Sequence, residues 1–366
     1  MRDTIFHRRC MALAGLSVAA GIGAMGGPVQ AQEAKGGNKV ELWGIVDNWA
    51  GMQRTRSGAT PGTVNVVESG GAQASRWGIR GTEDLGGGLK LQFALEQGLM
   101  TDTGGISNTS ASSQGFNRNS FLRLSGGFGD IKIGRMLTAY DAMRGPMNQL
   151  YDSSGFASTG QTWSAGATAG NGLPAVSGSD YLARTNNTVY YGTPEFHDFS
   201  GSISVGAGER ETTATAAPRT LTTNIKYDDD TLRVGYSFQK EHYTTGNNLF
   251  HLISGRYDFG SFRVVGSIQR QKEERVAGGQ TSKEYQFGVD VPFGAATVAL
   301  GIAGADTRNA ENRKVVDATG YSGMLTYDLS KRTRLYSAAR QLKVKRADGS
   351  TSLDVLRWGV GMTHRF

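Results

Sequence analysis

Few side chains of this 366-residue chain are placed for acid-base or nucleophilic chemistry. It has one Cys, and none of His197, His242, His251 and His364 stands beside a Ser or Asp in a recognisable nucleophile motif. No spacing of metal ligands stands out, and the Gly-rich stretch GTEDLGGGLK reads as a hairpin turn because no helix follows it. These patterns argue against a hydrolase and predict neither a metal nor a cofactor.

Arginines that alternate with apolar residues are the better candidates for function. In SRWGIRG, Arg76 and Arg80 fall on one parity and Trp77 and Ile79 on the other. Successive side chains of a strand point to opposite faces, so the stretch predicts a strand with one cationic, wet face and one apolar face. The chemistry available to such a surface is electrostatic.

The same alternation recurs along the chain, for example in LKLQFALEQG, TLRVGYSF, FRVVGSIQ and YQFGVD. Short turns such as YDDDT and YDFGS separate some of these segments, and longer polar stretches such as QKEERVAGGQTSKE separate others. We count 16 amphipathic segments from Val40 to the C-terminus, each with roughly 21 residues including its connection and about 10 for the span. The pattern predicts an all-β, 16-stranded antiparallel transmembrane β-barrel with short periplasmic turns and long extracellular loops.

The first 31 residues differ from the rest and predict a cleaved secretory signal. They combine Arg2, Arg8 and Arg9, a short apolar run and the small-residue site VQA before Gln32. Cys10 precedes the apolar run, which argues against a lipoprotein, and twin-arginine export through Arg8 and Arg9 is an alternative. We therefore expect residues 1–31 to be a signal peptide and residues 32–366 to be the barrel domain.

Removing residues 1–31 leaves no cysteine, 36 basic and 31 acidic residues, and a formal charge of +5. No later run of about 18 apolar residues could form a transmembrane helix. A soluble all-β sandwich also alternates, but it usually joins its strands by crossing connections of mixed length. The basic residues are dispersed and follow a signal peptide, so no nucleic-acid partner is expected.

Several long segments resemble the general bacterial porins, the trimeric 16-stranded channels of the Gram-negative outer membrane, in particular those of beta-proteobacteria. The segments are SRWGIRGTEDLGGGLKLQFALEQG, NSFLRLSGGFGDIKIGR, ARTNNTVYYGTPEF, YDLSKRTRLYSAAR and WGVGMTHRF. The terminal Phe366 resembles the signal by which the barrel-assembly machinery recognises its clients. The resemblance implies a homotrimer in contact with outer-membrane lipids and lipopolysaccharide.

The resemblance also implies a constriction. In this family the third extracellular loop folds into the lumen opposite a row of arginines, and the long gap from Met136 to about Leu182 lies after the fifth strand, where that loop belongs. The residues that match the family's cluster are Arg76, Arg135 and Arg184, with Asp141 and Asp152 as the carboxylates on the loop. Strand parity places Arg76 on the face toward water. It places Arg135 on the apolar face, together with Ile131 and Ile133, unless a bulge at Gly134 turns Arg135 inward.

The function implied is passive diffusion of ions and small hydrophilic solutes. Several arginines against few carboxylates, with a mature charge of +5, predict weak to moderate anion selectivity. Two alternatives stay open: a structural or adhesive barrel with a sealed lumen, and a channel selective for small anionic solutes.

Overall fold

The structure is a computed structural model of the chain. It describes residues 38–57, 61–106, 115–144, 158–163, 181–208, 218–275, 278–347 and 353–366. The expected signal peptide, residues 1–31, lies outside the described residues. No helix in these described ranges is long and apolar enough to cross a membrane.

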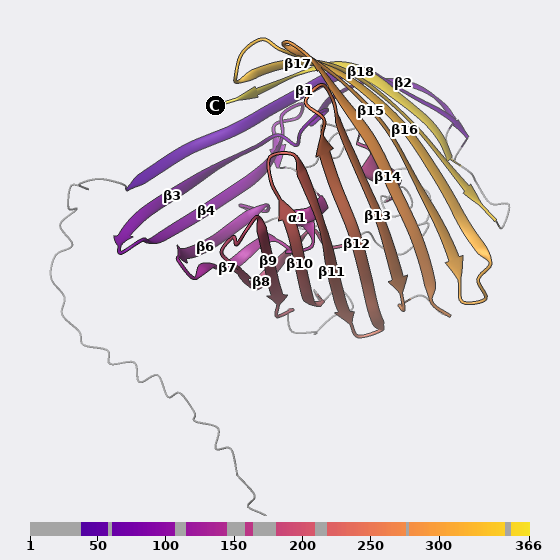
Figure 1. Cartoon of the computed structure of the whole chain (residues 1–366). Coiled ribbons are helices and arrows are strands. Elements are labelled where there is room, and N and C mark those ends of the chain that lie inside the picture. Colours follow the sequence, from indigo (N-terminus) through magenta and orange to yellow (C-terminus); the bar gives the residue numbers. More distant parts are fainter. Residues whose placement is uncertain are drawn as a thin grey trace, which may run out of the picture. The chain divides into compact units, whose positions relative to one another are not determined.

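The described residues form a single antiparallel sheet made of consecutive strands (Figure 1). The strands are β1 Lys39–Ser57, β2 Gly62–Ser69, β3 Arg76–Gly86, β4 Leu89–Met100, β5 Gly105–Ile106, β6 Asn119–Gly126, β7 Gly129–Leu137, β8 Arg184–Gly192, β9 Phe199–Gly206, β10 Arg219–Asp228, β11 Leu232–Tyr243, β12 Gly246–Asp258, β13 Arg263–Glu273, β14 Gln280–Phe293, β15 Ala296–Asn309, β16 Lys314–Asp328, β17 Thr333–Arg346 and β18 Leu353–Arg365. Two short helices, α1 Asp141–Arg144 and the 3-10 helix η1 Thr159–Thr162, lie between β7 and β8.

The 18 strand segments make 16 barrel strands. β5 has two residues and pairs only with the end of β4. β2 and β3 are two halves of one strand, because β1 pairs through residues 48–55 with β2 and through residues 39–45 with β3. β1 also pairs with β18, which closes the ring. The predicted 16-stranded antiparallel barrel is confirmed, and β11 to β18, with 11–15 residues each, are longer than the span of about 10 residues that was expected.

The connections differ at the two ends of the barrel. One end, which we call the turn end, holds the start of β1, the end of β18 and short connections such as residues 87–88, 229–231 and 294–295. The other, the loop end, holds the longest connection, residues 138–183, which we call loop 3. The predicted alternation of short turns and long loops has one exception among the described connections. The β11–β12 connection at the loop end is only residues 244–245.

Backbone amides stabilise the turns at the turn end. Between β10 and β11, the amides of Leu232 and Thr231 donate to Asp229 Oδ1 at 2.6 and 2.7 Å. The hydrogen bond from the Leu232 amide, then that from the Tyr227 hydroxyl and that from the Thr231 amide, hold the pKa of the Asp229 carboxyl below its usual range. Between β3 and β4, Gly86, Gly87 and Gly88 all have positive φ, which only glycine adopts without strain.

The strand alternation separates an outer apolar face from an inner polar face. On β13, Val264 and Ile268 are 39% and 52% exposed, whereas Ser267 and Gln269 on the other face are buried. The inner residues are buried because loop 3 lies against this wall, and Figure 1 shows α1 within the curve of the sheet beside β10 and β11. The inner face is therefore the lumen.

The interruption between β2 and β3 is an inward excursion of residues 70–75, held by Asp47 of β1. The amides of Gly71, Ala72 and Gln73 donate to the Asp47 carboxylate at 2.7, 3.2 and 2.9 Å. The hydroxyls of Tyr336 and Thr363, on β17 and β18, donate to the same carboxylate at 2.7 and 2.6 Å.

Apolar packing on the lumen side completes this arrangement. Ala72 packs against the buried inner cluster of Trp49, Ala299, Met324, Tyr336 and Ala338. A Cβ at Gly71 would lie 1.9 Å from Tyr336 Oη, so only glycine fits at that position. The excursion therefore fills part of the lumen on the wall made by β1 and β15–β17.

Candidate functional site

Arg76 and Arg118 meet at one buried carboxylate on the inner wall. Arg76 begins β3 opposite Ile45 of β1, on the face away from the exposed Leu42. Its Nε lies 3.3 Å from Glu96 Oε1, and Arg118 Nε donates to the same oxygen at 2.6 Å. Glu96 is 5% exposed and also accepts from Asn119 Nδ2. The carboxylate thus fixes two guanidinium groups side by side.

Arg135 sits at the break in strand regularity that the sequence suggested. Gly134 has a φ of 136°, and the β7–β8 register shifts between Gly134 and Met136, which is a bulge. Arg135 Nε donates to the carbonyl of Asn117 at 2.7 Å, and its Nη1 donates to Asn186 Oδ1 at 2.7 Å. Arg135 thus lies beside the segment that carries Arg118.

Arg184, the first residue of β8, joins these groups. The Arg184 guanidinium interacts electrostatically with four charged side chains, those of Arg118, Asp141, Glu96 and Arg135. Among the described residues its Nε has no hydrogen-bond partner. This Nε is buried, so Arg184 acts on an anion in the lumen through its charge and not through this donor.

Asp141 is brought to this cluster by loop 3. It begins α1, and Tyr181 Oη donates to its Oδ1 at 2.5 Å. The structure therefore gathers Arg76, Arg118, Arg135 and Arg184 around two carboxylates, Glu96 and Asp141, and we call these six residues the arginine cluster. Asp152, the other predicted loop carboxylate, lies outside the described residues.

Loop 3 is attached to the opposite part of the wall by side-chain hydrogen bonds. Tyr140 Oη donates to Gln269 Oε1 at 2.5 Å, and Thr159 Oγ1 donates to Gln286 Oε1 at 2.8 Å. Trp163 Nε1 donates to the carbonyl of Tyr285 at 3.0 Å. The predicted inward fold of this loop is confirmed.

Apolar side chains of loop 3 pack against the same wall. The cluster contains Tyr140, Met143, Trp163 and Tyr181 from the loop and Phe250, Leu252, Val265 and Ala303 from the strands. The loop therefore narrows the lumen from the β11–β16 side and presents Asp141 to the arginines on the β3–β8 side.

Further cations lie on the inner wall outside the arginine cluster. Toward the turn end, Lys132 of β7 lies opposite Arg123 of β6, and both pair with Asp130, at 3.4 and 3.3 Å. At the ring closure, Arg340 of β17 lies opposite Arg357 of β18. Arg357 Nη2 donates to Glu68 Oε2 at 2.5 Å, so this second pair also has a carboxylate partner.

Sequence reasoning missed Arg118, Glu96, Arg340 and Arg357. The parity of LKLQFALEQG did place Glu96 on the wet face, but nothing local indicated that its partners come from two other segments. Arg357 and its partner Glu68 are separated by 289 positions in sequence, so only ring closure brings them together.

The C-terminal residue takes part in that closure. The backbone of Phe366 exchanges two hydrogen bonds of 3.1 Å with Gly44 of β1. A Cβ at Gly44 would lie 2.3 Å from the Phe366 ring, so the glycine leaves room for it. The predicted role of Phe366 as an assembly signal stays a prediction.

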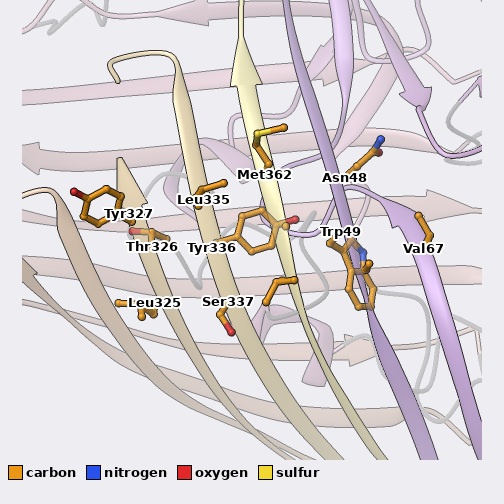
Figure 2. A pocket seen from close by; sticks show the side chains of 13 residues that line it. Asn48, Trp49, Val67, Leu325, Thr326, Tyr327, Leu335, Tyr336, Ser337 and Met362 are labelled. Atoms are coloured by element: carbon orange, nitrogen blue, oxygen red, sulfur yellow. The ribbon is translucent and has the colours of Figure 1, made fainter. Parts of the chain in front are cut away.

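An apolar groove of about 690 Å³ crosses the outer face where the ring closes, on β16, β17, β18, β1 and β2 (Figure 2). Val67, Leu325, Leu335, Val360 and Met362 line it and are 41–67% exposed. A polar side chain, Asn48, lies in the same groove and accepts a hydrogen bond from Thr101.

No group of His, Cys, Asp and Glu side chains that could hold a metal occurs in the described part of the chain.

Comparisons with known proteins agree with this architecture. A family model described as Gram-negative porin matches residues 14–347. The outer membrane porin protein 32 of Delftia acidovorans is 31% identical over 330 residues, which cover 86% of each chain.

Two solved structures have a similar fold. An anion-selective porin from Comamonas acidovorans is 27% identical with a TM-score of 0.74, and the match covers 90% of this chain and 100% of that one. The trimer form of OmpT from Vibrio cholerae has a TM-score of 0.65 at 14% identity, over 90% of this chain and 99% of that one.

Proposed function

Because this chain belongs to the Gram-negative porin family, we propose that it forms an outer-membrane channel whose pore prefers anions to cations. Porins are channels and not enzymes, and they pass ions and small hydrophilic solutes by passive diffusion through the water-filled lumen of a barrel. The proposal concerns what the residues of this particular lumen add to that activity.

The arginine cluster carries the proposal. Arg76, Arg118, Arg135 and Arg184 stand against Glu96 and Asp141, at the place where loop 3 narrows the lumen. An excess of positive charge in a narrow, low-dielectric passage favours the entry of anions. Arg184 adds its positive charge to this field from a half-buried position on the same wall.

Chloride and small organic anions are the expected solutes, and the other cations of the inner wall fit the same path. Arg123 and Lys132 line the wall toward the turn end, and Arg340 and Arg357 line the wall at the ring closure. The described strands carry the termini at the turn end, which we assign to the periplasm, and loop 3 at the loop end, which we assign to the cell exterior. Residues 1–31 would direct export and be removed.

We further propose a homotrimer joined through the outer groove at the ring closure. The trimer form among the similar folds supports this assembly for the barrel type. The outward position of Asn48, hydrogen-bonded to Thr101 just after β4, also favours a protein neighbour over lipid, because polar groups are costly in hydrocarbon.

The experiment is the reversal potential of the purified protein in a planar bilayer under a KCl gradient near 0.1 M. We expect stepwise conductance and a potential that favours chloride. The triple variant Arg76→Gln, Arg118→Gln, Arg184→Gln should lower the anion-to-cation permeability ratio by about threefold to tenfold, from Coulomb interactions of ~0.5 kcal/mol per charge at about 8 Å in water. A triple Lys331→Gln, Lys343→Gln, Lys345→Gln is the matched control, because it loses the same charge at one exposed position in the β16–β17 turn and two exposed outer positions of β17.

Other outcomes would contradict the proposal in different ways. A cation-favouring potential in the wild-type protein would remove the selectivity but leave the channel. No conductance from a folded barrel would favour a sealed structural or adhesive barrel. Current that saturates with one organic anion would indicate a channel selective for that solute.

A further inference from the structure

The 3-10 helix η1 of loop 3 is attached to the inner wall at both of its ends. Thr159 Oγ1, at its start, donates to Gln286 Oε1 at 2.8 Å, and Trp163 Nε1, just after its end, donates to the carbonyl of Tyr285 at 3.0 Å. Both acceptors belong to β14, and η1 also lies next to β15 and β16. These contacts fix η1 against three neighbouring strands of the wall.

The wall beneath η1 has small side chains. Gln286 of β14, Ala303 of β15 and Gly320 of β16 lie directly opposite one another in the strand register. They are on the inner face, and Ala303 is fully buried in the cluster that contains Trp163. Because Gly320 has no side chain at all, the loop can approach the backbone of β16 closely at this position.

The close approach is made by Thr162, the last residue of η1. A Cβ at Gly320 would lie 2.0 Å from Thr162 Oγ1, 3.2 Å from its Cβ and 3.5 Å from its Cγ2. An ordinary contact needs about 3.5 Å, so the hydroxyl would have to move by about 1.5 Å. Rotation of the Thr162 side chain moves Oγ1 but leaves its Cβ in place, and that atom would still be too close.

The Thr162 hydroxyl fills space at this contact and holds no partner. Thr162 is 1% exposed, and its Oγ1 makes no hydrogen bond within the described part of the chain. Replacing Thr162 with alanine would therefore remove the two atoms that stand above Gly320 without breaking a hydrogen bond. The distance between η1 and the wall thus depends on the combined size of the side chains at positions 162 and 320.

The other described helix of loop 3, α1, lies over a second glycine of the wall. A Cβ at Gly235 of β11 would lie 2.6 Å from Cε of Met143, whose side chain is fully buried. It would also lie 2.7 Å from the carbonyl of Ile225, so a side chain there would disturb the pairing of β10 with β11. All three nearest atoms at Gly320 belong to loop 3, which makes Gly320 the cleaner position for a test.

We propose that Gly320 sets the width of the passage, because it lets η1 lie close enough to the wall for loop 3 to leave the pore open. Loop 3 lies inside the lumen, so a side chain between η1 and β16 would push the loop toward the pore axis. Solute selection by a channel depends on pore diameter, so a shift comparable to the radius of a water molecule matters. The inference concerns the size of the passage and is independent of its preference for anions.

The test is single-channel conductance in KCl, combined with the largest neutral polyethylene glycol that enters the pore. We expect Gly320→Ala to lower conductance by about 1.5-fold and Gly320→Val by about twofold or more, with smaller polymers excluded in the same order. The anion-to-cation permeability ratio should change little, because no charge changes. The control Gly323→Ala adds the same methyl group to the same strand, where its nearest neighbour is Leu300 Cδ2 at 3.4 Å, and should conduct like wild type.

A size exchange shows whether the effect passes through η1. The double variant Gly320→Ala, Thr162→Ala should return conductance and polymer size limit close to the wild-type values, because the added methyl group takes the space that Oγ1 and Cγ2 leave. A narrowing that Thr162→Ala does not reverse would overturn the proposal, since a general distortion of the barrel would not be rescued by a smaller loop residue. Wild-type conductance and size limit in a folded Gly320→Val would also overturn it.

Heat-dependent gel mobility identifies folded barrels, and the two alanine variants decide the question if Gly320→Val does not fold. Failure of this inference can be told apart from failure of the proposed selectivity. A wild-type pore that favours cations would contradict the selectivity and leave the role of Gly320 intact. A folded wild-type barrel without conductance would overturn both.

Discussion

Glu96 partly neutralises the positive charge of the arginine cluster. Its substitution therefore tests whether the charge of this cluster sets the ion selectivity. It pairs with Arg76 at 3.3 Å and Arg118 at 2.6 Å, and it is nearly buried. Glu96→Gln keeps the shape but frees two guanidinium charges, so we expect a higher chloride-to-potassium permeability ratio in the bilayer. The same change should cost about 1–3 kcal/mol of unfolding free energy, because charged hydrogen bonds are lost. Glu83→Gln, at an exposed position of β3, is the control, and a ratio that stays the same or falls would show that ions do not sense this carboxylate.

The residues of the site could be predicted only where family resemblance or local parity marked them. Arg76 follows from the alternation in SRWGIRG, and the bulge at Gly134 was inferred because Arg135 shares the parity of Ile131 and Ile133. Glu96 and Arg118 could not be paired in this way, because their contact joins segments 22 positions apart across a loop. The two-residue alternation along a strand shows which face of the sheet a side chain is on. It carries no information about the partner of that side chain on another strand.

At the scale of elements, the excursion between β2 and β3 depends on one carboxylate. Asp47 is fully buried and accepts from three amides and two hydroxyls. Asp47→Ala leaves these donors without a partner, so we expect a loss of about 3 kcal/mol or more in barrel stability. Asp47→Asn keeps one carbonyl acceptor and should lie between the two. Thermal unfolding followed by heat-dependent gel mobility measures the effect, with the exposed Asp102→Ala as control; a variant as stable as that control would refute the role of Asp47.

The same excursion marks the limit of sequence analysis for elements. The alternating segments and the long connection after the fifth strand were predictable, because strand period and loop composition are local properties. The stretch SGGAQAS lies between two segments that both pair with β1 and form one strand. Its true geometry depends on Asp47, Tyr336 and Thr363, which lie up to 316 positions apart.

For the whole molecule, the groove at the ring closure predicts how copies assemble. Ala50 lies outward on β1 within this groove, so Ala50→Trp would fill the space that a neighbouring copy takes in the proposed trimer. Tryptophan is well tolerated against lipid, hence the barrel should fold and insert while trimers give way to monomers. Light scattering coupled to size-exclusion chromatography in detergent measures the change.

The control for assembly is Ile225→Trp, on the outer face of β10 on the other side of the ring, where the wild-type side chain is 58% exposed. It adds the same side chain to a face that we expect to meet lipid, so trimers should persist. Dissociation in both variants would indicate a general loss of stability, and trimers in both would place the interface elsewhere on the barrel. Loss of trimers in Ala50→Trp alone, with single-barrel conductance retained, is the result expected if each barrel holds its own pore and the groove serves only assembly.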